Sequence, residues 1–140
     1  MEKIQLKKLA NFFFEKLQRL STKEWDEISV VIVDDVLSQK INNMHLQHDY
    51  PTDVITYTLP PLPSEDTFSG EIIVNTQYAA RHANKSFPFS RELALYIAHG
   101  FDHLSGADDK SEEEHNKMRR RELRWLREAQ KRALLSVDNL

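Results

Sequence analysis

The segment at residues 27–34, which reads EISVVIVD, constrains the fold more than any other part of this sequence. It is continuous and rich in β-branched residues, a pattern typical of a buried strand. Residues 53–59 (DVITYTL) and 70–74 (GEIIV) predict two more strands, and the prolines from Pro60 onward end the first of these because proline supplies no ladder donor. We therefore expect a small mixed β-sheet.

Helical patterns lie before, between and after these strands. Residues 4–20 space their apolar side chains mainly three and four apart, as in an amphipathic helix. Asp34 or Asp35 and Ser90 are expected to act as N-caps. The remaining helices are predicted at residues 35–44, 75–84 and 90–104 and after Ser111. This order predicts one α+β domain over residues 1–140, in which helices cover the sheet.

Composition excludes several classes of protein. The chain has no cysteine, so disulfides and thiolate metal sites are excluded. Its 19 Lys and Arg against 22 Asp and Glu give a formal net charge of -3, so there is no global attraction for nucleic acid. No run approaches the roughly 20 apolar residues of a membrane span, and residues 1–20 do not have the pattern of a secretory signal. We expect a cytoplasmic protein without a membrane partner.

Three residues near the end of the predicted helix at 90–104 can bind one metal ion. His99 and His103 are four apart, so both imidazoles lie on one face of that helix. Gly106 can adopt a left-handed conformation and turn the chain so that Asp109 returns toward the two histidines. Three protein ligands with one open position are typical of a catalytic zinc site, in which bound water becomes acidic.

This motif also fits two other interpretations. An isolated HxxxH pair is more often two ordinary surface histidines, and it is Gly106 and Asp109 that favour the metal site. The spacing also matches the HExxHxxGxxH motif of metzincin proteases, with Asp109 in the last place. However, Gly100 stands where those proteases have their glutamate general base, which argues against peptidase chemistry.

The predicted last helix carries a basic stripe. Arg120, Arg124, Arg127 and Lys131 lie along the side opposite its apolar residues and suit contact with RNA phosphates. A charged stripe is, by itself, more often a solvated helix face.

The motif from His99 onward resembles that of the YbeY family, bacterial ribosomal-RNA maturation factors described as zinc-dependent single-strand endoribonucleases. The family signature HGxLHLxGYDH is matched at His99, Gly100, His103, Leu104, Gly106 and Asp108. The sequence departs from it at Asp102, Ala107 and Asp109, which replace leucine, tyrosine and the third histidine. Residues 51–54 (PTDV) and 70–72 (GEI) also match family strands, and the resemblance spans roughly residues 42–125. Leu46 stands where the family has an arginine implicated in RNA handling.

The resemblance implies a metal-dependent, single-strand-specific endoribonuclease that acts in ribosome biogenesis, at the 3′ end of 16S ribosomal RNA. It implies one Zn²⁺ per chain, held by His99, His103 and Asp109, and the carboxylate also suits nickel or manganese. The expected partners are ribosomal RNA and the small ribosomal subunit, and no DNA partner is expected. Asp102 and Asp108 are candidates for orienting the ligand imidazoles, and no general base is identified.

Two alternatives remain open at this point. The first is a non-catalytic ribosome-assembly or RNA-binding factor, in which the metal only holds the helix end to the following turn. The second is a metallohydrolase of another substrate class, such as a peptidase.

Overall fold

A three-stranded mixed sheet forms the centre of the computed structural model, which describes residues 2–4 and 6–137. Its strand order is β2 (Trp25–Val33), β4 (Phe68–Asn75), β3 (Val54–Leu59). β2 pairs parallel to β4, with Val31 opposite Ile73, whereas β3 pairs antiparallel to β4, with Ile55 opposite Ile73. The sequence prediction of a small mixed sheet is confirmed.

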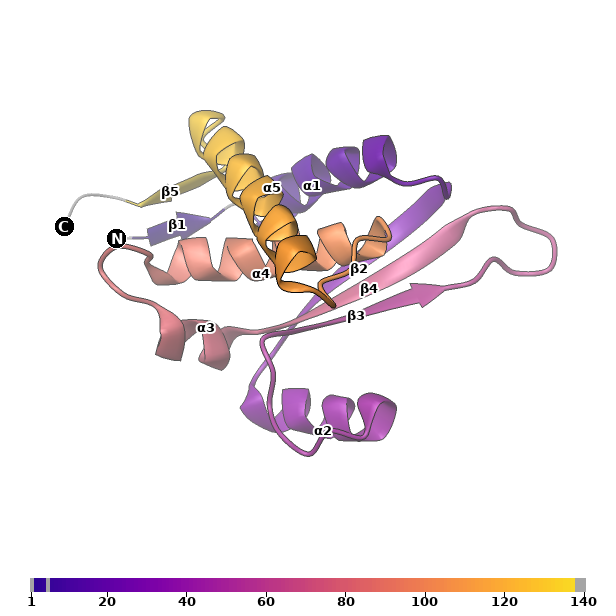
Figure 1. Ribbon diagram of the computed structural model, residues 1–140, viewed down its shortest axis with the longest axis horizontal. Helices are drawn as coiled ribbons and strands as arrows, with labels where there is room; N and C mark the ends of the chain where they lie inside the picture. The colour runs from indigo at the N-terminus through magenta and orange to yellow at the C-terminus, as the bar shows by residue number, and fades with distance from the viewer. Residues whose placement is uncertain (1, 5, 138–140) are drawn as a thin grey trace.

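Helix α4 (Phe89–Leu104) lies along one face of this sheet (Figure 1). Helices α1 (Leu6–Leu20) and α5 (Glu112–Lys131) pack against α4 on the same side of the sheet. The opposite face of the sheet is covered in part by α2 (Asp35–Leu46). The short α3 (Thr76–His82) follows β4 and packs against α4. α4 is therefore the central helix of a single α+β domain, as the sequence predicted.

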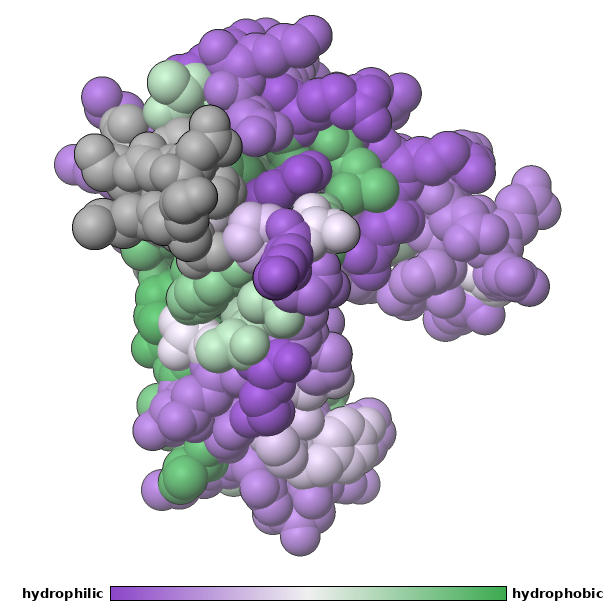
Figure 2. Space-filling model, turned by 90° about the vertical axis from the view of Figure 1, so that its left-hand side faces the viewer, coloured by the Kyte–Doolittle hydropathy of each residue, from purple (hydrophilic) through white to green (hydrophobic). Residues whose placement is uncertain are grey.

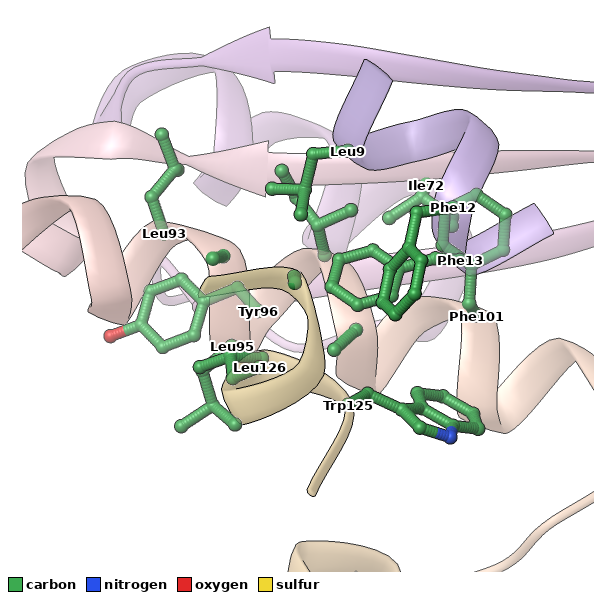
Figure 3. Close-up of a cluster of buried hydrophobic side chains, with 14 of the residues drawn as sticks. Leu9, Phe12, Phe13, Ile72, Leu93, Leu95, Tyr96, Phe101, Trp125 and Leu126 are labelled. Atoms are coloured by element: carbon green, nitrogen blue, oxygen red, sulfur yellow. The ribbon is translucent and has the colours of Figure 1, made fainter. Parts of the chain in front are cut away.

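Aromatic side chains from three helices fill the main core (Figure 3). Phe13 of α1 lies 6.0 Å from Phe101 of α4 and 6.2 Å from Trp125 of α5, measured between ring centroids. On the sheet side, a Cβ atom at Gly100 would lie only 2.6 Å from Cγ2 of Ile72 on β4. Glycine at this position of the HGxxH motif thus allows the close approach of α4 to the sheet, which brings the neighbouring histidines to the edge of β3.

The helix ends agree with most of the local predictions. Asp34 caps α2 by accepting from the backbone N–H of Leu37, and Ser111 caps α5 by accepting from the backbone N–H of Glu114.

The prediction that Ser90 caps α4 is wrong. Pro88 is the N-cap, because its extended backbone places its carbonyl to accept from the N–H of Arg91 and of Glu92, and Ser90 is buried inside the first turn.

A second, two-stranded sheet was not predicted. β1 (Glu2–Ile4) pairs antiparallel with β5 (Leu135–Val137), which joins the two ends of the described chain beside α4 (Figure 1). Viewed from the side that carries α3, the molecular surface is mainly hydrophilic, with hydrophobic surface along the left edge and in a smaller patch at the upper right (Figure 2). Among the helices of residues 2–4 and 6–137, none combines the length and apolar character needed to span a membrane.

Candidate metal centre

Helix α4 brings the two histidines of the HGxxH motif together. His99 and His103 are one helical turn apart, and their Nε2 atoms lie 3.0 Å from each other. Their rings meet edge to face, with centroids 4.4 Å apart. The two Nε2 atoms therefore converge on one point beside the end of α4.

The turn after α4 brings Asp109 to the same point. Gly106 has the left-handed backbone that the sequence predicted, with φ of 103°, and its N–H donates to the carbonyl of His103. Asp109 Oδ2 consequently lies 3.9 Å from His99 Nε2 and 3.8 Å from His103 Nε2. Ligand atoms bound at about 2.1 Å to a tetrahedral ion are about 3.4 Å from one another, so this donor set fits a zinc ion.

Glu122 of α5 holds the His99 ring in place. Its side chain is fully buried, and its Oε2 accepts from His99 Nδ1 at 2.8 Å, which leaves the lone pair on Nε2 for a metal. Burial opposes the charged imidazolium, but the hydrogen bond to Glu122 and the negative charges of Glu122, Asp53 and Asp109 together outweigh burial and raise the pKa of His99 above its usual value. A carboxylate in this position also makes the imidazole a stronger ligand.

A backbone carbonyl orients the ring of His103, as Glu122 orients the ring of His99. The carbonyl oxygen of Ala107 lies 3.2 Å from His103 Nδ1 and accepts a hydrogen bond from Nδ1–H when Nε2 is the metal-binding atom. Because the main chain makes this contact, the side chain at position 107 is not required for it.

Asp102 lies directly behind the metal centre, with a side chain that is 0% exposed. Its Oδ1 accepts from Arg121 Nε at 2.9 Å and from Nη2 at 2.7 Å. Burial, reinforced by hydrogen bonding to Glu122 and opposed by Arg121, raises the pKa of Asp102 to about 7. Asp102 Oδ2 and Glu122 Oε1 are both buried without a donor in the described part of the chain, so a proton held between the two acids would satisfy both oxygens.

Asp108 lies away from the imidazoles. Its side chain is exposed and forms an ion pair of 3.5 Å with Lys110. The two aspartates that the sequence offered as partners of the imidazoles thus contact cations instead, Asp102 with Arg121 and Asp108 with Lys110.

The sequence analysis did not identify Glu122 as the residue that orients His99. The sequence does contain an indication of it, because Glu122 is the acidic residue within the apolar stripe that contains Met118, Trp125 and Leu126.

A hollow of about 700 Å³ opens in front of the three candidate ligands. Its opposite wall consists of the start of β3 and the segment before it. The residues that contribute to this wall are Leu46, His48, Tyr50, Thr52, Asp53, Val54, Ile55 and Thr56. The open side of the ligand set therefore faces a space of the size usual for a binding site, roughly 300–1,000 Å³.

The basic stripe lies elsewhere on the molecule. Arg120, Arg124, Arg127 and Lys131 are all exposed on α5, as predicted, and none of them lines this hollow. Within the described ranges, none of the four forms an ion pair. The structure thus brings His99, His103 and Asp109 together and leaves the four basic residues free on a separate surface.

Comparison with known proteins identifies the family. The family model described as Endoribonuclease YbeY matches residues 1–130. The chain belongs to this family. An Endoribonuclease YbeY from Rhodopirellula baltica is 43% identical over a 101-residue alignment that covers 69% of this chain and 50% of that protein. The matched part of this chain thus spans half the length of that relative.

Two further YbeY relatives match over a larger share of their length. The Salinibacter ruber protein is 36% identical over 106 residues, covering 71% of this chain and 68% of the relative. The Syntrophotalea carbinolica protein is 38% identical over 104 residues, covering 69% and 68%. Both are described as Endoribonuclease YbeY, so the resemblance found in the sequence motif is confirmed at the level of the family.

Proposed function

We propose that this protein is a metal-dependent endoribonuclease that cleaves single-stranded RNA. The observation that carries the proposal is the convergence of His99 Nε2, His103 Nε2 and Asp109 Oδ2 on one point, with their open side on a hollow, in a chain of the YbeY family. Three protein ligands and an open position favour a catalytic role for the metal over a structural one. We propose Zn²⁺ as the ion, with nickel or manganese as alternatives that the carboxylate of Asp109 permits.

The chain's own residues prepare the centre for this chemistry. A bound metal would supply a Lewis acid that polarises the scissile phosphate and acidifies water. His99 and His103 provide neutral nitrogen ligands, because Glu122 and the Ala107 carbonyl accept hydrogen bonds from their Nδ1–H groups and leave each Nε2 unprotonated for the metal. Asp109 contributes one negative charge, which would lower the net positive charge that the metal site presents to an anionic phosphodiester.

The proposed substrate is ribosomal RNA, in the maturation of the 3′ end of the 16S molecule, with the small ribosomal subunit as partner. A role in ribosome assembly would place the protein in the cytoplasm. The exposed cations Arg120, Arg124, Arg127 and Lys131 support this proposal, because such a stripe suits phosphates of a large RNA outside the hollow.

The test combines metal analysis with cleavage of RNA. Purified protein is expected to contain about one zinc ion per chain and to cleave a single-stranded fragment of 16S RNA, and a chelator should stop cleavage until zinc is restored. Cleavage that persists in the fully metal-free protein would contradict the proposal. A duplex of the same sequence serves as the control and should remain intact.

A further inference from the structure

The wall of the hollow opposite the metal centre carries a pair of parallel rings. His48 and Tyr50 stack with centroids 5.3 Å apart and an interplanar angle of 10°. Both residues are exposed, Tyr50 at 52%, and both line the same hollow as His99 and His103. An exposed aromatic stack inside a binding hollow can be extended by a third flat ring.

The charge of the hollow favours an uncharged group at this wall. Asp53 and Asp109 are the charged residues among the described side chains that line it, and the lining includes neither Lys nor Arg. Leu46, which precedes the stacked pair, is apolar and 48% exposed. On this wall, away from the three candidate metal ligands, the described lining offers a phosphate no lysine or arginine side chain, so the wall suits the base of a nucleotide better than its backbone.

Hydrogen bonds to α2 hold the segment that carries the two rings. The buried side chain of Asn42 donates to the carbonyl of Tyr50 at 2.9 Å, and Gln39 donates to Asp49 Oδ1 at 3.0 Å. Ser38 Oγ accepts from the N–H of Thr52 at 3.1 Å, on the other side of Tyr50. The backbone around the stack is thus fixed before any ligand arrives, which lowers the entropic cost of binding.

We propose that His48 and Tyr50 form a stacking platform for one unpaired nucleobase of the RNA whose backbone reaches the metal centre. The proposal rests on the function proposed above and adds a specificity element to the same site. A base within a duplex already has neighbours on both faces, whereas an unpaired base can leave its strand and stack on the protein. The platform would therefore select single strands by their bases, without a lysine or arginine among the described residues that line the hollow.

The experiment uses an eight-nucleotide 2′-O-methyl RNA that contains one 2-aminopurine, whose fluorescence falls when the base stacks. The metal-loaded protein is expected to quench this probe. Tyr50→Ala should lower the affinity for the RNA about tenfold, because it removes the aromatic ring on which the base stacks. Tyr50→Phe keeps the ring and should bind within about twofold of the original protein.

A second stacked pair on the same molecule gives a matched control. Tyr78 and His82 of α3 stack at 4.3 Å and 11° and do not line the hollow, so His82→Ala should leave the affinity unchanged. Unchanged affinity in Tyr50→Ala, or an original protein that does not quench the probe, would overturn the platform. With unmodified RNA, Tyr50→Ala should raise KM about tenfold and leave kcat nearly unchanged, because it removes binding that is equal in ground and transition states.

The two proposals fail in different ways. A protein that quenches the probe through Tyr50 but cleaves no RNA supports the platform and contradicts the endoribonuclease. A protein that cleaves RNA, and whose Tyr50→Ala variant binds and cleaves like the original, supports the endoribonuclease and contradicts the platform.

Discussion

Replacement of His103 by alanine is expected to abolish RNA cleavage, lowering kcat/KM by about a thousandfold or more, while the protein remains folded. The size follows from losing a metal that supplies several kcal/mol of transition-state stabilisation. The fold should persist because the His103 side chain is 27% exposed and, among the described residues, its polar contacts are with its neighbours in the site, His99, Asp109 and the Ala107 carbonyl. Asp109→Ala, at a side chain that is 38% exposed, should behave in the same way. Cleavage of single-stranded 16S RNA and metal content measure the effect.

Asp108→Ala is the matched control for this result. It removes an exposed carboxylate next to Asp109 that forms an ion pair with Lys110 on the surface, so metal content and cleavage should stay near those of the original protein. Full cleavage by His103→Ala or Asp109→Ala would contradict the endoribonuclease proposal. A sharp fall in the melting temperature of both variants, in a protein that cleaves no RNA, would instead assign the metal a structural role.

Replacement of Glu122 by alanine is expected to weaken zinc binding about 10- to 100-fold, because outer partners of metal-binding histidines contribute that much to affinity. His99 would lose the buried acceptor that directs its Nε2 toward the ligand set. Glu122→Gln keeps a hydrogen-bond acceptor but loses the negative charge, so its zinc affinity should lie between that of the original protein and that of Glu122→Ala. Competition with a chromophoric chelator measures the affinity, and Glu112→Ala, in the exposed first turn of the same helix, is the control.

The parts of the site that depend on local structure could be predicted from the sequence. The four-residue spacing of His99 and His103 determines that they share a helix face, and a glycine after a helix favours the left-handed turn found at Gly106. Ser90 was misassigned because serine is a common N-cap, whereas Pro88 supplies the first turn with a carbonyl and its backbone direction.

The contacts that hold the site together could not be predicted in this way. Glu122 reaches His99 across 23 positions of sequence, through the packing of α5 on α4. The pairing of β1 with β5 likewise joins segments whose patterns are too short to indicate a strand. Helical spacing predicts which face of α5 is buried, but it does not predict which residue of α4 an acid on that face will meet.

Replacement of Asp102 by leucine, the residue that the family motif has at this position, is expected to destabilise the protein by about 2–4 kcal/mol. Removing one partner of a buried ion pair costs about 3–5 kcal/mol, and the cost is lower here because Arg121 is 22% exposed and can reach water. Glu122 would also lose the neighbour with which a proton can be shared. Asp102→Asn keeps an acceptor for Arg121 and gains a donor for Glu122, so it should cost less.

A double-mutant cycle in urea separates the pair from its surroundings. If Asp102 and Arg121 are present as a matched pair, changing both to leucine should recover much of the stability that Asp102→Leu alone removes, because no buried charge is left without a partner. If the double variant loses as much unfolding free energy as the two single variants together, the two residues act independently. Recovery would mean that Arg121 contributes to stability mainly by pairing with Asp102 behind the metal centre.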